Sequence, residues 1–148
     1  MKNVPNRLLQ RGFTLIEIMV VVVILGVLAA IVVPRIMDKP DEARAAKAKQ
    51  DIRALESAIE LYKLDNFNYP STQQGLDALT TKPAGEPQPK NYKQGGYIKQ
   101  LPKDPWGNPY QYLSPGTHGD VDIFTFGADN QPGGTGTASD IGNWNLGG

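Results

Sequence analysis

The sequence predicts an α+β protein, with a long N-terminal α-helix packed on a small antiparallel β-sheet. An apolar run, followed by apolar residues at helical spacing, occupies positions 13–65. Further along, two short apolar segments flank a connection that contains Gly and Pro, which is typical of a β-hairpin. The 148 residues suffice for one domain, and 15 basic against 15 acidic residues indicate no polyanionic partner.

The first element is an apolar run of 21 residues at positions 13–33, with Glu17 as its single charged side chain. A helix rising ~1.5 Å per residue over this run would cross a hydrocarbon core of ~30 Å, so we expect a transmembrane helix. A carboxylate inside it costs roughly 2.5–3.5 kcal/mol, which indicates a task for Glu17. The basic residues Lys2, Arg7 and Arg11 precede the run without an acid and favour a cytoplasmic N-terminus.

The length and charge of this N-terminus allow two common interpretations, a cleaved secretory signal and a plain signal anchor. A cleaved secretory signal also has a basic start and an apolar run, but this run is long for one, and Leu28 occupies a cleavage-site position that favours small side chains. A plain signal anchor explains the length and the charge but gives Glu17 no task. Glu17 could also simply be hydrated near the membrane edge.

A second helical segment is predicted at residues 34–65, as an amphipathic continuation of the first. We expect a kink or local melting at Pro34, because an interior proline removes a helix hydrogen bond. Alternatively the first helix ends there, and a new helix starts at residues 38–41 with Pro40 in its first turn. The stripe predicted to be buried against the C-terminal domain consists of Ala48, Ile52, Leu55, Ile59 and Tyr62, widened by Ala45, Ala58 and Leu61.

Residues 66–148 are expected to form a small globular domain rich in loops. Within it, a short helix is predicted at residues 71–79, with Ser71 or Thr72 as its cap. Residues 82–96 contain three prolines and three glycines, and we expect an exposed but ordered loop there.

Two strands are predicted in the C-terminal half, at residues 110–113 and 121–126, paired as an antiparallel hairpin. Large aromatic residues in a small domain usually belong to the core or cover it. The side-chain expectations are therefore a core or covering position for Trp106 and Trp144, and exposed positions beside the hairpin turn for Asp120 and Asp122.

No set of residues in the sequence points to catalysis. His118 is the single histidine and lies in a Gly/Pro-rich turn without an obvious base or nucleophile partner. The chain has no cysteine, no His/Cys metal set and no glycine-rich phosphate loop after a strand. We predict that the chain is not an enzyme. No Lys or Arg follows Lys103, and this acidic tail counts against nucleic acid as a partner.

The glycine-rich stretch at residues 129–144 has no strong apolar pattern, so something else must offset the entropy of ordering it. Asp129 and Asp140 flank its most flexible part, and carboxylate and carbonyl oxygens suit Ca²⁺. Two aspartates at this spacing are a weak signal. The residues alone therefore leave open that both are turn and cap residues.

Residues 11–17, Arg-Gly-Phe-Thr-Leu-Ile-Glu, closely resemble the processing site of type IV pilins and their pseudopilin relatives. The resemblance implies that residues 1–12 are a leader, that a prepilin peptidase cuts between Gly12 and Phe13, and that the new amine of Phe13 is methylated. A buried carboxylate needs a partner. In a filament of parallel helices, the amine of a neighbouring Phe13 would pair with Glu17 and set the register between subunits.

Three C-terminal motifs, at residues 104–110, 126–129 and 140–144, look like those of the major pseudopilins of type II secretion systems. This resemblance implies a type IV pilin-like fold with a calcium-binding C-terminal loop. It assigns Asp129 and Asp140 as side-chain ligands and the carbonyl of Phe126 as a backbone ligand. A further carbonyl from residues 134–139 is implied but not assigned, and Ser139 could compete with Asp140.

The function that the resemblance implies is that of a structural subunit. It would cross the inner membrane once with its C-terminal domain in the periplasm, then polymerise through its N-terminal helix into a pseudopilus that drives export of folded proteins. The implied partners are copies of itself, the prepilin peptidase, minor pseudopilins, the inner-membrane assembly platform and the outer-membrane secretin, with no nucleic acid.

Two alternatives to this function stay open from the sequence. A type IV pilin for adhesion, motility or DNA uptake shares the N-terminus, but usually closes its C-terminal region with a disulfide that this cysteine-free chain cannot form. A membrane-anchored binding module that does not polymerise would tolerate a neutral residue in place of Glu17.

Overall fold

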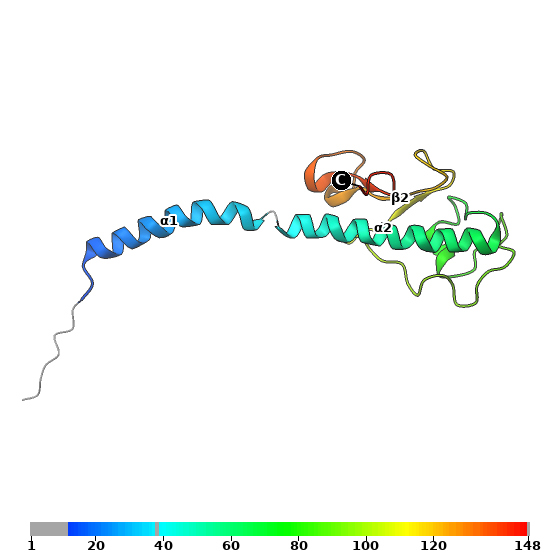
Figure 1. Cartoon of the computed structure of the whole chain (residues 1–148), viewed down its shortest axis with the longest axis horizontal. Helices are drawn as coiled ribbons and strands as arrows, with labels where there is room; N and C mark the ends of the chain where they lie inside the picture. Colours follow the sequence, from blue (N-terminus) through cyan, green and yellow to red (C-terminus); the bar gives the residue numbers. More distant parts are fainter. Residues whose placement is uncertain (1–11, 38, 148) are drawn as a thin grey trace, which may run out of the picture. The chain divides into compact units, whose positions relative to one another are not determined.

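The computed structural model describes residues 12–37 and 39–147, and the chain divides into two units, Met1–Lys39 and Pro40–Gly148. In the described residues, the first unit contributes one α-helix, and the second combines an α-helix with a three-stranded antiparallel sheet and short 3₁₀ helices (Figure 1). The predicted α+β class is confirmed.

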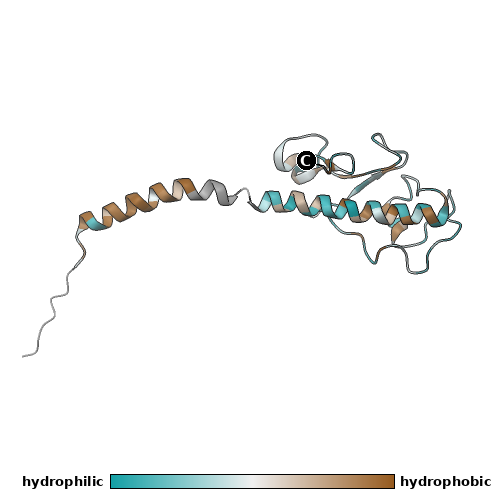
Figure 2. Ribbon diagram, in the orientation of Figure 1, coloured by the Kyte–Doolittle hydropathy of each residue, from teal (hydrophilic) through white to brown (hydrophobic). Residues whose placement is uncertain are grey.

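Helix α1, Leu15–Met37, is apolar on all sides over most of its length (Figure 2). It includes Pro34, so the described backbone has no helix end at the proline, and a bend or melting there stays a prediction. The large apolar side chains from Phe13 to Ile31 are all more than half exposed. Among the residues that the structure describes, no helix combines the length and apolarity needed to cross a membrane.

Helix α2, Lys39–Asn66, carries the buried stripe of the second unit. Pro40 lies in its first turn, as in the alternative of a new helix that starts at residues 38–41, whereas Asp38 lies outside the described residues. The five residues of the predicted stripe are at most 1% exposed, and Ala58 is also buried. Leu61 is 51% exposed, so its prediction as part of the stripe is wrong. It follows Ala54 and Ser57 at helical spacing, and that row faces away from the core.

The sheet has the order β1-β2-β3 and consists of β1 (Gln111–Leu113), β2 (Asp122–Thr125) and β3 (Ile141–Gly142). The predicted hairpin is β1 with β2, in antiparallel register with Tyr112 opposite Ile123. The sequence did not reveal β3, because two residues are too short for a strand pattern. Its Ile141 pairs with Thr125 of β2 and joins the core cluster against α2.

The predicted short helix at residues 71–79 is two smaller pieces. Residues 71–74 form a turn in which Ser71 and Gln74 each accept a hydrogen bond from the other's backbone N–H, and Leu76–Leu79 is the 3₁₀ helix η1. Gly75 separates them with φ +61°, a left-handed conformation that a continuous helix does not allow.

The predicted ordered loop at residues 82–96 is confirmed, because it contains no helix or strand in the described structure and is held to the end of α2. Asn91 donates its backbone N–H to the side chain of Asn66 at 3.0 Å and its amide to the carbonyl of Asp65 at 3.1 Å.

Asp104 ties the turn before β1 to the sheet. This buried carboxylate accepts hydrogen bonds from the backbone N–H groups of Trp106 and Asn108, at 3.0 and 2.7 Å, and from the hydroxyl of Thr125. Trp106 packs against the core, as predicted.

We expect Asp104→Ala to lower the free energy of unfolding of the full chain by about 3 kcal/mol. The substitution leaves the buried hydroxyl of Thr125 and two N–H groups without their acceptor, and an unsatisfied buried group costs about 1–3 kcal/mol. Urea unfolding in a non-ionic detergent measures the effect. The matched control is Asp77→Ala, an exposed carboxylate, which should change the stability by at most about 0.5 kcal/mol. Equal values for the two variants would contradict the assigned role of Asp104.

Candidate functional site

The predicted cleavage point lies in exposed, non-helical backbone directly before α1. Gly12, Phe13 and Thr14 have no regular secondary structure, and the Phe13 side chain is 84% exposed. A protease needs an accessible peptide bond outside regular secondary structure, and the bond between Gly12 and Phe13 has both properties. Residues 1–11 of the predicted leader lie outside the described residues.

Thr14 and Glu17 form a capping box at the start of α1. The Glu17 carboxylate accepts hydrogen bonds from the backbone N–H of Thr14 at 2.7 Å and from its hydroxyl at 2.9 Å, while the Glu17 N–H donates to the Thr14 hydroxyl at 3.3 Å. In the single chain the carboxylate therefore binds its own helix terminus. Its predicted pairing with the amine of a neighbouring Phe13 stays a prediction. The Thr-x-x-Glu spacing could have revealed the box from sequence.

The predicted calcium ligands lie in two 3₁₀ helices and the residues beside them. Phe126 precedes η2 (Gly127–Asp129), and Asp140 follows η3 (Gly136–Ala138) and Ser139. The two 3₁₀ helices contact each other. A Cβ atom on Gly127 would lie 2.8 Å from the carbonyl oxygens of both Thr137 and Ser139, so these two carbonyls face the backbone of η2.

The loop fits a hard cation such as Ca²⁺. Oδ1 of Asp140 is buried and has no hydrogen-bond partner among the described residues, whereas its Oδ2 accepts from the N–H of Gly133 at 2.9 Å. An unsatisfied buried carboxylate oxygen is costly unless a cation or water binds it. Asp129 is exposed and accepts from the N–H of Gln131 at 3.1 Å. Within the described chain no three acidic or His side chains gather, so carbonyl oxygens would have to supply further ligands.

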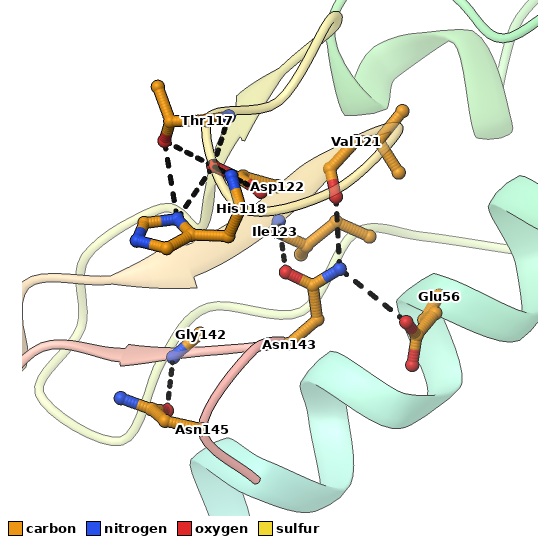
Figure 3. A network of polar contacts seen from close by, with 9 residues as sticks. All are labelled: Glu56, Thr117, His118, Val121, Asp122, Ile123, Gly142, Asn143 and Asn145. Atoms are coloured by element: carbon orange, nitrogen blue, oxygen red, sulfur yellow. Dashed lines mark hydrogen bonds and ion pairs between the residues drawn. The ribbon is translucent and has the colours of Figure 1, made fainter.

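A second polar network anchors the hairpin turn around Asp122 (Figure 3). Asp122 is 1% exposed, so the prediction that it is exposed is wrong, whereas Asp120 is exposed as expected. The carboxylate of Asp122 turns inward because it accepts hydrogen bonds from the N–H of Thr117 at 2.7 Å and of His118 at 3.2 Å, and from the Thr117 hydroxyl. Burial raises the pKa of Asp122, but these hydrogen bonds outweigh it and lower the pKa to about 2.

His118 has a structural position in this network. Its ring stacks on Trp144, with centroids 3.8 Å apart, and its Nδ1 lies 3.0 Å from Asp122. The hydroxyl of Thr117 approaches the same Nδ1 atom, at 3.2 Å. In a catalytic triad, acid and nucleophile contact opposite ring nitrogens, so this arrangement cannot relay a proton from Thr117 through the ring. Trp144 is 37% exposed and covers Gly142, where a Cβ atom would lie 2.3 Å from the indole ring.

The side chain of Asn143 links the segment after β3 to both the sheet and α2 by hydrogen bonds (Figure 3). Its side chain accepts from the N–H of Ile123 at 3.2 Å and donates to the carbonyl of Val121 at 3.0 Å and to Glu56 of α2 at 3.4 Å. Asn145 accepts from the N–H of Gly142 at 2.9 Å. These side-chain bonds hold a C-terminal region that has no disulfide.

The chain is similar over most of its length to proteins of one kind. Residues 35–144 match the family described as "Type II secretion system (T2SS), protein G", and residues 7–33 match the "Prokaryotic N-terminal methylation motif". The type II secretion system core protein G of Pseudomonas aeruginosa is 64% identical over 135 residues, which cover 91% of this chain and 95% of that protein. The protein of the same name from Vibrio cholerae is 63% identical over 137 residues, 93% of each chain.

A solved structure is also similar. The crystal structure of the major pseudopilin from the type 2 secretion system of enterohaemorrhagic Escherichia coli matches with a TM-score of 0.68 and 50% sequence identity. The match covers 76% of this chain and 96% of that one.

We expect the stability that Asp122 contributes to be complete above about pH 5 and to fall by about 2 kcal/mol between pH 5 and pH 2. The folded pKa of about 2 lies below the ordinary value of 3.8, so the folded state loses its advantage as protonation sets in. The measurement is the difference in unfolding free energy between the wild type and Asp122→Asn at each pH. This difference should shrink on acidification. A pH-independent difference for Asp122→Asn would contradict the assignment.

Proposed function

The chain belongs to the type II secretion system protein G family, and on this premise we propose that it is the structural subunit of a secretion pseudopilus. The observation that carries the proposal is the N-terminal methylation motif at residues 7–33, which joins an accessible Gly12-Phe13 bond to the apolar helix α1. A type IV pilin for adhesion, motility or DNA uptake is not favoured, because residues 35–144 match the protein G family.

The proposed sequence of events starts at the membrane. The apolar run at residues 13–33 holds the precursor in the inner membrane in a single pass, with the second unit in the periplasm. The prepilin peptidase removes residues 1–12 and methylates Phe13. Its substrate bond lies before the capping box, so cleavage leaves the Thr14–Glu17 hydrogen bonds and the start of α1 in place.

Assembly into the filament would then bury α1. The large apolar side chains from Leu15 to Ile31 are more than half exposed, and contact with α1 of other copies removes them from water or lipid. Glu17 pairs with the Phe13 amine of a neighbouring copy and so sets the axial register, while Pro34 lets the helix bend or melt. The further partners that we propose are minor pseudopilins, the inner-membrane assembly platform and the outer-membrane secretin.

We also propose that the C-terminal loop binds one Ca²⁺ ion. Asp129 and Asp140 supply carboxylate oxygens and Phe126 a carbonyl oxygen. The unpartnered Oδ1 of Asp140 supports this assignment. The carbonyls of Thr137 and Ser139, which face Gly127, are candidates for the remaining backbone ligand, with Ser139 acting through its main chain. When bound, the ion offsets the carboxylate charges and links the two 3₁₀ helices.

The experiment that tests the proposed function is intact mass and N-terminal sequencing of the protein from cells that contain a prepilin peptidase. The expected product starts at methylated Phe13. Gly12→Val should accumulate as the full-length precursor, whereas Gly26→Ala, a glycine within α1, should be processed normally. An unprocessed wild type, or a start near Ile31 as left by a secretory signal peptidase, would overturn the proposal.

For calcium, we expect EGTA to lower the thermal midpoint of the full chain by about 10 °C relative to saturating Ca²⁺. Ligand at 100 times its Kd stabilises by about 2.7 kcal/mol, and 1 kcal/mol shifts a domain of this size by several degrees. Asp129→Ala and Asp140→Ala should melt at the EGTA midpoint and lose the response to Ca²⁺. Asp77→Ala is the control and should keep the response. An EGTA effect of the same size in all three variants would contradict the ligand assignment.

A further inference from the structure

The last two turns of α2 carry an exposed apolar surface, which we call the α2-end patch and define as Leu61, Leu64 and Phe67. Their exposed fractions are 51%, 71% and 72%. Leu61 and Leu64 are three residues apart and therefore share a helix face, and Phe67 directly follows the helix. In the described part of the second unit, Trp144 is the only other large apolar residue classed as exposed, and its ring already stacks on His118.

Phe67 is an unusual residue for its backbone position. It has φ +66°, and its N–H caps α2 by donating to the carbonyl of Lys63 at 2.7 Å. This left-handed position after a helix normally holds Gly or Asn, because a larger side chain is strained there. The chain has Asn on both sides of Phe67 and yet places the aromatic ring at this point. Within one copy the ring gains little in return, since Lys90, with its Nζ 5.8 Å from the ring centroid, leaves it mostly exposed.

A second copy of this chain offers only a few apolar surfaces, in its described residues, that could cover the α2-end patch. Among described residues, the exposed large apolar side chains belong to the α2-end patch, to Trp144, and to Phe13 with the following helix α1. Contact of patch with patch is isologous and closes as a dimer. Contact of the patch with α1 is heterologous. One unused patch and one unused α1 then remain at the two ends of a row of subunits, so that further copies can be added, as a growing filament requires.

We infer that the α2-end patch is a docking surface for helix α1 of a second copy of this chain. The inference rests on the proposed function, because it names a further contact of the same filament. The patch lies at the C-terminal end of α2, and residues 38–60 separate it from the chain's own α1, so one copy offers acceptor and donor surfaces at different positions along its sequence.

The first experiment compares Leu64→Gln, Phe67→Asn and their double variant with the wild type in cells that assemble the filament. We expect the yield of sheared fibres to fall at least ten-fold in the double variant, with normal processing to methylated Phe13. The thermal midpoint of each full-length chain in detergent should stay within about 2 °C of the wild type or rise, because Asn suits the backbone at position 67. The exposed control Gln100→Ala should give normal fibres.

The outcomes separate the two proposals. Normal fibre yield in the double variant would overturn the inference and leave the proposed function intact. A wild type that is neither processed nor assembled would overturn both. If Leu64→Gln lowers the midpoint together with the yield, Phe67→Asn alone decides, since it relieves strain and removes only the ring.

The second experiment uses the absence of native cysteines. Leu64→Cys is combined in turn with a cysteine at Val20, Ile24 or Leu28 of α1, and membranes and fibres are oxidised. A ladder of dimers, trimers and larger species in at least one double variant, with none for Leu64→Cys alone, supports contact between patch and α1. Dimers from Leu64→Cys alone would indicate contact of patch with patch, and no crosslink in any double variant of normal fibre yield would also overturn the inference.

Discussion

The second unit depends on one constraint, the burial of a single face of α2. Ile52, Leu55, Ile59 and Tyr62 are essentially inaccessible to water, and the sheet and loops of the domain cover them. The strands are only two to four residues long, so they could not form a stable sheet by themselves. The apolar face of α2 is the surface on which the strands pair. The sheet in turn stabilises α2 by burying that face, because most of the stability of a helix in a protein comes from such packing.

The polar groups then decide how the irregular segments lie on that core. Asp104, Asp122 and Asn143 each bind backbone groups of at least one other segment, and each does so at a turn or strand end. A chain without cysteines can hold its C-terminal region in this way because most of these bonds pair backbone N–H or C=O groups of the irregular segments. Among the described residues, the buried side-chain oxygens without a hydrogen-bond partner are the hydroxyls of Tyr62 and Tyr92 and Oδ1 of Asp140, which lies in the glycine-rich C-terminal loop.

The sequence was sufficient for features with a repeating pattern or a local signal. The buried stripe of α2 and the β1-β2 hairpin follow from periodicities of about 3.6 and 2 residues. Three features had no such signal. Strand β3 is too short to show a period, Asp122 is buried only because its own hairpin turn folds over its carboxylate, and the exposure of Leu61 depends on the angular width of the surface that covers α2. Asp129 and Asp140 could be named from the sequence as candidate calcium ligands, and this role stays a prediction. Their surroundings, including the unpartnered Oδ1 of Asp140 among the described residues, could be seen only in the folded loop.

The capping box at the start of α1 has a consequence for how firmly one subunit holds the next. Glu17 already has hydrogen bonds to Thr14 in the single chain. If Glu17 turns to the amine of a neighbour, it gives up these hydrogen bonds for an ion pair. The carboxylate is not unpaired before the exchange. The net free energy of that exchange is smaller than the strength of the ion pair suggests. Such a swap would favour the correct register while adding little to the strength of the contact, so the affinity between subunits would come mainly from apolar contact.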